Sequence, residues 1–211
     1  MMGCNFRKTN YNTKIYGIEE RGEVRLRRAA IFSALMFGWI LIWALVFKFG
    51  SEILMLRNYH NLKDMTIGDR LLWDLIPFNY RGDEYWIMRQ KIDTVLNCFV
   101  FSPFGVFFSY AFKKGRIIYG LPLCFAICAT VEISQLFTLL GNFATEDFIT
   151  NIAGYFIGLI IYLIIFKRLS VTQSTAFFRV INVLLAILAI FSVGTLIYTR
   201  DVIVGIITRA F

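Results

Sequence analysis

Two pairs of polar residues interrupt the apolar stretches near the middle of the chain. Glu132 and Gln135 are three residues apart, and Asp147 and Asn151 are four apart, so each pair would share one face of a helix. The short polar turn between the pairs predicts antiparallel helices whose polar faces meet at the same depth. A carboxylate inside a membrane is costly, so it normally faces the protein interior and has a partner. Glu132 is therefore the first candidate for binding or chemistry.

The two carboxyls could act in catalysis, bind a ligand or hold the fold together. Glu132, among Ile, Val, Leu and Phe, could transfer a proton as a general acid or base. It could equally bind a cationic headgroup, or form a structural hydrogen bond with Gln135 or Asn151. Asp147 could serve as a general base, or it could cap the N-terminus of the helix that begins near it. For each residue these alternatives stay open.

Further polar side chains lie outside these two pairs. Asn97 follows Asp93 by one helical turn at the start of another apolar stretch, and amides at such depth often join helices. Arg70 and Arg81, in a long hydrophilic connection, could contact a phosphate group. We therefore predict a ligand-binding set with a secondary group beside it: Asn97, Glu132, Gln135, Asp147 and Asn151, then Arg70, Arg81 and Asp93.

Residues that usually hold metals are sparse. His60 is the sole histidine, and Cys98, Cys124 and Cys128 lie within apolar stretches. These residues do not form a zinc pattern, so we predict no metal site and no cofactor. We interpret the cysteines as small packing residues.

The composition is that of a membrane protein. The 211 residues are 58% hydrophobic, with a mean hydropathy of +0.64, whereas soluble domains average about 45–50% apolar. The net charge of +8 comes from Lys and Arg at the ends of apolar stretches rather than in one patch. That distribution fits membrane topology and lipid headgroups, so we predict no nucleic-acid partner.

The apolar stretches predict an all-α, polytopic transmembrane bundle of about five spans. We expect a cytoplasmic basic tail (1–28) that ends in a short interfacial helix, a membrane domain (29–168), and a final segment with linker, fifth span and short tail (169–211). The predicted spans are 29–49, 93–112, 117–140, 147–166 and 176–198, with an outer loop at 50–92. Pro103 should bend or break the second span. Gly154 and Gly158 predict a close-packing helix face.

The distribution of Lys and Arg also predicts the topology. The tail and the segments 113–116 and 167–179 are basic, and with the N-terminus inside they all fall on the cytoplasmic side. We therefore predict the N-terminus inside and the C-terminus outside. The candidate acids and amides would then converge on the outer leaflet.

The same residues resemble the VanZ-like family of bacterial membrane proteins. The resemblance covers roughly residues 40–165, and its motifs are DLIPF (74–78), NCFVFSPFG (97–105), E-x-x-Q at Glu132 and D-x-x-x-N-x-x-G at Asp147. The family pattern usually has an Arg before the Asp-bearing turn, where this chain has Asn142. If that Arg balances a buried acid, this chain must use another cation or a protonated carboxyl.

The resemblance implies an envelope-protection role. The founding member of the family is associated with resistance to teicoplanin-type glycopeptide antibiotics, which act on cell-wall precursors at the outer membrane face. We therefore expect a multi-pass protein of the bacterial cytoplasmic membrane whose outer-leaflet pocket binds a membrane lipid or a lipid-linked cell-wall precursor.

Three alternatives remain beside this hypothesis. The chain could be a small intramembrane hydrolase or transferase that acts on a lipid headgroup, with Glu132 or Asp147 as general base. It could be a structural partner of another membrane complex. A transporter is disfavoured because the polar residues gather on one side, whereas carriers place their sites near the midplane.

Overall fold

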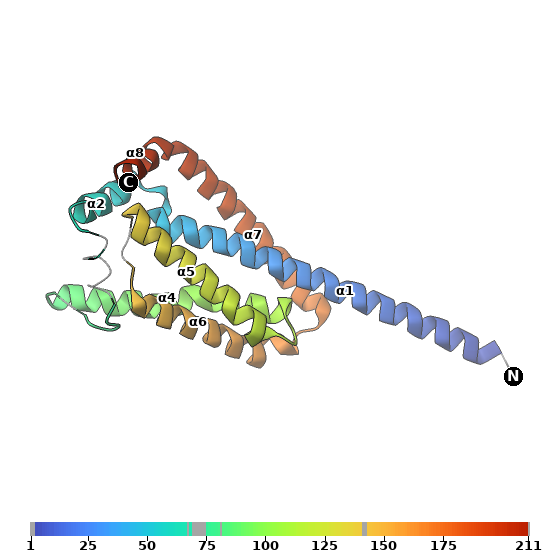
Figure 1. Cartoon of the computed structure of the whole chain (residues 1–211). Coiled ribbons are helices and arrows are strands. Elements are labelled where there is room, and N and C mark those ends of the chain that lie inside the picture. Colours follow the sequence, from blue (N-terminus) through green and yellow to red (C-terminus); the bar gives the residue numbers. More distant parts are fainter. Residues whose placement is uncertain (1–2, 67, 69–74, 81, 141–142, 211) are drawn as a thin grey trace.

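The computed structural model describes residues 3–66, 68, 75–80, 82–140 and 143–210, and these residues form helices and no strands. Five helices are long and apolar enough to cross a membrane: Glu20–Val46, Glu84–Ala111, Arg116–Thr138, Thr145–Arg168 and Val171–Tyr198. The predicted all-α bundle with about five spans is thus confirmed. Figure 1 shows the N-terminus and the C-terminus at opposite ends of the bundle. Which end faces the cytoplasm remains a prediction.

The helices follow one another with short connections. In chain order they are α1 (Gly3–Leu41), the π-turn η1 (Ile42–Val46), the short turn η2 (Lys48–Gly50), α2 (Glu52–Leu62), α4 (Glu84–Ala111), the π-turn η3 (Arg116–Gly120), α5 (Leu121–Thr138), α6 (Thr145–Ile164), the 3₁₀ turn η4 (Phe166–Arg168), α7 (Val171–Tyr198) and α8 (Arg200–Ala210).

Several helices extend past the predicted apolar limits. Helix α1 continues from the tail into the first span without a break, so the tail does not end in a separate interfacial helix. Its sequence holds no proline to stop it. Helix α7 starts at Val171, inside the predicted linker, because Ser170 and Gln173 form a reciprocal capping box. The predicted short tail after the fifth span is helix α8.

Helices α4 and α6 pack with their backbones in close contact. A side chain at Gly154 would collide with the Cys98 carbonyl, and one at Gly158 would collide with the Ser102 carbonyl. From the other helix, a side chain at Gly105 would collide with the Tyr155 carbonyl. The predicted close-packing face is confirmed. Helix α4 continues through Pro103, so this proline does not break the span.

Helices α1 and α7 form a second pair joined by polar contacts. The Ser33 hydroxyl donates to Asn182 Oδ1 at 2.6 Å. Further along, the indole N–H groups of Trp39 and Trp43 donate to the hydroxyls of Ser192 (2.7 Å) and Thr195 (2.8 Å). Within a membrane such bonds hold helices together, because lipid offers the polar groups no other partner.

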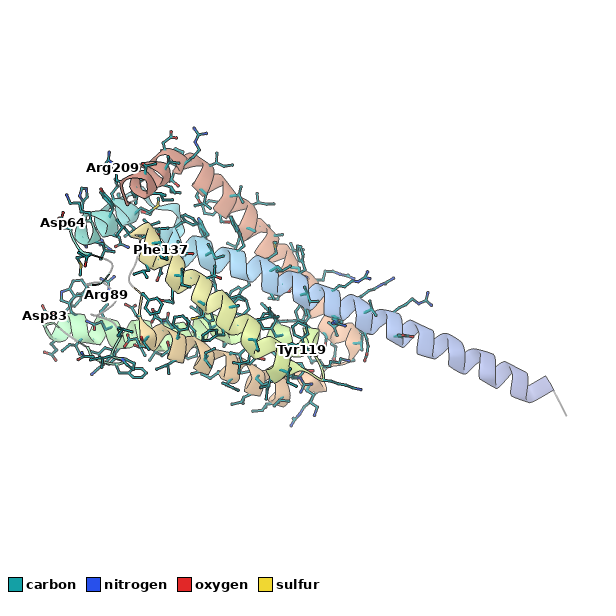
Figure 2. The ribbon with its side chains drawn as sticks, in the orientation of Figure 1. Asp64, Asp83, Arg89, Tyr119, Phe137 and Arg209 are labelled. Carbon is teal, nitrogen blue, oxygen red and sulfur yellow. The ribbon has the colours of Figure 1, made fainter. Side chains whose placement is uncertain are left out.

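The two ends of the bundle differ in what they contain. At the N-terminal end, α1 leaves the bundle beside the connection between α4 and η3 and the turn η4 (Figure 1). The C-terminal end holds η2, α2, α8 and the point where α5 ends and α6 begins. Figure 2 shows Asp64, Asp83, Arg89 and Arg209 at this C-terminal end and Tyr119 near the other.

Candidate functional site

The predicted polar residues meet at the C-terminal end of the bundle, where α6 begins beside α4. The Asn97 side-chain amide on α4 donates to Asp147 Oδ1 on α6 at 2.5 Å. The N-cap of α6 is Ala144, whose own side chain makes no capping hydrogen bond. Asp147 is therefore not the N-cap residue: it lies in the first turn of α6, where a negative charge is favoured, and joins this helix to α4.

Glu132 faces the protein interior. Its residue is 2% exposed, on α5, and its Oε2 accepts the backbone N–H of Ala144 at 3.1 Å. The first N–H groups of a helix lack intrahelical partners, and the N-terminus of a helix favours negative charge. Glu132 thus fixes the turn that leads from α5 into α6.

Gln135 reaches the end of α1. Its Nε2 donates to the Leu45 carbonyl at 3.0 Å, within the π-turn η1. Residues at a π-turn depart from the regular i→i−4 pattern and often lie at functional sites. The bond between Glu132 and Gln135 that the sequence suggested stays a prediction.

Asn151 is buried at 2% exposure, and its two amide atoms differ. Its Nδ2 donates to Cys128 Sγ at 3.1 Å, so Cys128 is a hydrogen-bond acceptor as well as a packing residue. Its Oδ1 is buried and has no hydrogen-bond partner among the described residues. Most buried polar groups in proteins are hydrogen-bonded, so this oxygen is a candidate contact for a polar group of a ligand.

Lys48 is a residue of this end that the sequence analysis did not single out. The span that should include it ends at Val46, and Lys48 begins the turn η2 that follows. Lys48 (φ 49°), Phe49 (φ 59°) and Gly50 (φ 68°) all have left-handed backbones. Non-glycine residues rarely adopt this conformation, and such strain is found preferentially at functional sites.

The charge of Lys48 belongs to the same site. Burial lowers the pKa of Lys48 from its usual 10.5. Three negative charges act in the opposite direction, those of Glu132, Asp147 and Asp93. Lys48 is thus a cation close enough to the acids of the site to interact with them. Asn142 lies outside the described residues. The signal in the sequence that could have pointed to Lys48 is a single lysine followed by Phe-Gly at the end of a span.

Glu146 is a second residue that the sequence analysis did not single out for the site. Its Oε2 accepts the backbone N–H of Phe78 at 3.0 Å, and its Oε1 accepts the Thr94 hydroxyl at 3.5 Å. Tyr80 contacts the same Thr94 hydroxyl at 3.1 Å. The described part of the DLIPF motif is therefore tied to the start of α6.

The secondary candidates are not brought together by described contacts. Asp93 is exposed on α4, and it takes part through its charge on Lys48. Arg70 and Arg81, together with Asp74 of the DLIPF motif, lie outside the described residues. Their predicted contacts with phosphate stay predictions.

The five main candidates come from three helices and lie around one helix junction. The junction consists of two carboxylates and three amides. Most of the described hydrogen bonds of these side chains go to backbone atoms or to one another. Within the described part of the chain, half-buried Lys48 forms no ion pair and the Asn151 amide oxygen has no hydrogen-bond partner, so both could contact a ligand. This arrangement can bind a polar or anionic group.

The comparisons with known proteins agree with the motifs. The family model described as VanZ/LLP1 matches residues 18–167, which includes the first three spans, all but the last residue of the fourth and every main candidate residue. Protein VanZ of Enterococcus faecium is 30% identical over 148 residues, covering 70% of this chain and 82% of that protein. No solved structure matches the chain. Since the family model matches most of its length, the chain is a multi-pass membrane protein that belongs to the VanZ/LLP1 family.

Proposed function

We propose that this protein lies in the bacterial cytoplasmic membrane and gives resistance to teicoplanin-type glycopeptides. It does so by binding a lipid-like or lipid-linked cell-wall precursor at the polar junction, which faces the outer leaflet. The observation that carries the proposal is the junction itself: Asn97, Glu132, Gln135, Asp147 and Asn151 come from three helices to one end of the bundle. Family membership supports the resistance role.

The chemistry of the junction suits such a ligand. Lys48 can pair with an anionic group, and the pair would be strong because Lys48 is half-buried. The Asn151 oxygen can accept a hydrogen bond from a hydroxyl or an amide of the ligand. Glu132 and Asp147 hold the surrounding backbone and helices in place, which keeps these two groups available.

The test is resistance in a susceptible host. Cells of a teicoplanin-susceptible bacterium that express this chain should show a raised minimum inhibitory concentration. Glu132→Gln and Lys48→Gln should return it toward the value of cells without the protein. The matched controls are Glu52→Gln and Lys63→Gln, which remove the same charges from exposed side chains at the same end.

Membrane abundance must be measured for every variant by immunoblotting. Full resistance of Glu132→Ala at normal abundance would rule out the proposed role of the junction. No resistance from the wild-type chain at normal abundance would rule out the glycopeptide role. If the purified protein converted a lipid-linked precursor to a new product, the proposed binding role would be replaced by catalysis.

A further inference from the structure

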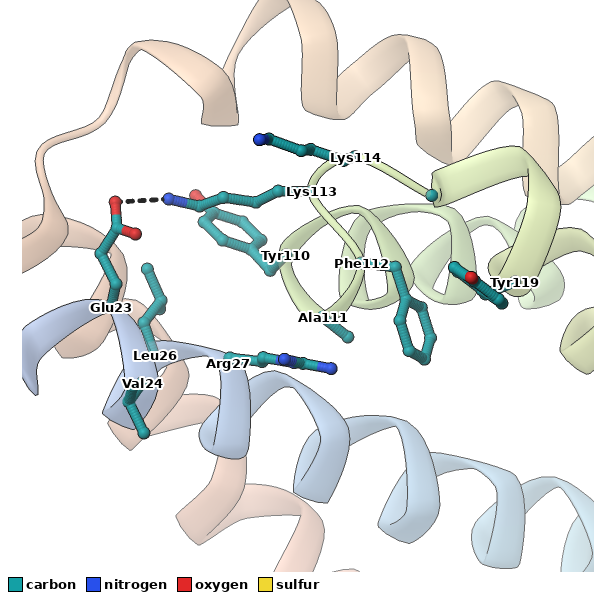
Figure 3. Close-up of a pocket in the computed structure, with 11 residues that line it drawn as sticks. Glu23, Val24, Leu26, Arg27, Tyr110, Ala111, Phe112, Lys113, Lys114 and Tyr119 are labelled. Carbon is teal, nitrogen blue, oxygen red and sulfur yellow. Dashed lines mark hydrogen bonds and ion pairs between the residues drawn. The ribbon is translucent and has the colours of Figure 1, made fainter. Parts of the chain in front are cut away.

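A cavity of about 410 Å³ lies at the N-terminal end of the bundle, remote from the polar junction. It is formed by α1, by the last residues of α4 and by the connection from α4 to η3. Figure 3 shows Glu23 and Arg27 on α1, with Lys113 and Lys114 on the connection that faces them. Ligand pockets commonly measure about 300–1,000 Å³, so this cavity is large enough for a headgroup.

The cavity is lined by positive charge. Arg27, Lys113 and Lys114 contribute three cations, and Glu23 is the one acid among its described lining residues. Glu23 and Lys113 form an ion pair at 2.6 Å, with side chains 52% and 47% exposed. Arg27 and Lys114 form no ion pair with any described residue. The cavity therefore has two cations left for an anionic ligand.

The remaining lining residues are apolar or aromatic. Leu26 and Ala111 are buried beneath the charges, and the Tyr110 hydroxyl is already bonded to Ser174 and to the Phe166 carbonyl. The rings of Phe112 and Tyr119 lie 5.9 Å apart on one side. The Tyr119 ring is exposed, and Ile117 and Ile118 beside it in the chain are also exposed. Apolar surface thus adjoins the cations.

We propose that this cavity binds the phosphate of an anionic phospholipid headgroup. It lies where one span ends at Ala111 and the next begins at Arg116, which is the depth of lipid headgroups. Basic pockets between transmembrane helices bind such headgroups, and each cation near the surface attracts them. The exposed aliphatic and aromatic side chains beside it can contact the acyl chains. A free phosphate ion would use the same cations but gain nothing from this apolar surface.

The proposal does not depend on the function of the polar junction. The two sites share no residue and lie at opposite ends of the bundle. Failure of one proposal leaves the other unaffected.

The test is lipid retention by the full-length protein in detergent, measured by native mass spectrometry. The probes are phosphatidylglycerol, phosphatidylcholine with the same acyl chains, and inorganic phosphate. Wild-type protein should retain phosphatidylglycerol in preference to the other two. Arg27→Gln/Lys114→Gln should reduce this retention about fivefold for each charge removed.

The matched control is Lys167→Gln/Arg168→Gln, which removes two exposed cations at the same end that do not line the cavity. It should leave retention unchanged. Glu23→Gln should raise retention, because it frees Lys113. Equal loss in the control, or no loss in the Arg27/Lys114 variant, would overturn the proposal. Inorganic phosphate that binds as well as phosphatidylglycerol would overturn the lipid assignment.

Discussion

The two ends of this bundle use charged residues in opposite ways. At the C-terminal end, Glu132 is buried and bonded to a backbone N–H, and Asp147 is bonded to the Asn97 amide. At the N-terminal end, Glu23 and Lys113 meet on the surface with about half of each side chain exposed. Buried polar groups are expensive to leave unpaired, whereas exposed ion pairs contribute little.

This difference means that the acids at the C-terminal end help to hold the fold together, whereas the charges at the N-terminal end lie on the surface. Changes to the acids and amides of the polar junction should affect stability and function together, since their hydrogen bonds serve both. Changes in the basic cavity should affect binding of anions while the fold stays intact. Variants at both ends can test this contrast, and the first concerns the packing of α4 on α6, because this helix pair connects the two ends.

The largest effect is expected from Gly158→Leu. The new side chain would collide with the Ser102 carbonyl of α4, so the helix pair that connects both ends must move apart. We expect a loss of more than about 3 kcal/mol of unfolding free energy, and low membrane abundance. Thermal unfolding in detergent measures this. The control is Gly194→Ala, which has open space around it. An unchanged melting temperature for Gly158→Leu would contradict the described packing of α4 on α6.

A smaller loss is expected from Glu132→Ala. The variant leaves the Ala144 N–H without its acceptor, which costs about 1–3 kcal/mol for a buried group. Glu132→Gln keeps an acceptor oxygen and should lose less. The measurement is the free energy of unfolding in denaturant, with Glu52→Ala as the exposed control. Equal losses for Glu132→Ala and Glu52→Ala would show that the carboxylate is not held in the junction.

Lys48→Gly should stabilise the protein and at the same time abolish its function. Glycine adopts a left-handed backbone without strain, and the variant also removes a half-buried charge. We expect a gain of up to about 1 kcal/mol in unfolding free energy, together with loss of resistance. Thermal unfolding and the minimum inhibitory concentration are measured on the same variant. Retained resistance would remove Lys48 from the proposed site.

The smallest effect on stability is expected from Lys113→Gln. This variant removes the ion pair with Glu23, and exposed pairs contribute about 0–1 kcal/mol. The small loss should vanish in 1 M salt, because screening weakens interactions between exposed charges. Unfolding free energies of wild type and variant at low and high salt give the comparison. A loss as large as that of Glu132→Ala would contradict the proposed contrast between the two ends.

Much of the site could be predicted because its signals are local. The spacing of Glu132 with Gln135 and of Asp147 with Asn151 placed each pair on one helix face, and the structure brings both faces to one junction. The individual hydrogen-bond partners could not be predicted. Asn97 meets Asp147 because glycines allow α4 and α6 to approach closely, and no local pattern gives the register between two helices.

The sequence by itself determined the class of protein, the number of apolar helices and the residues that carry its polar chemistry. Hydropathy and helical periodicity are properties of short segments, so they are readable before the chain folds. The tertiary structure decided that Lys48 joins the site, since its place at the end of a span does not show which acids it meets. Helix α1 ends in a π-turn and then a left-handed turn at Gly50, which packs against Thr195 of α7 so tightly that a side chain would not fit. A contact between residues far apart in sequence thus holds the turn that carries this lysine.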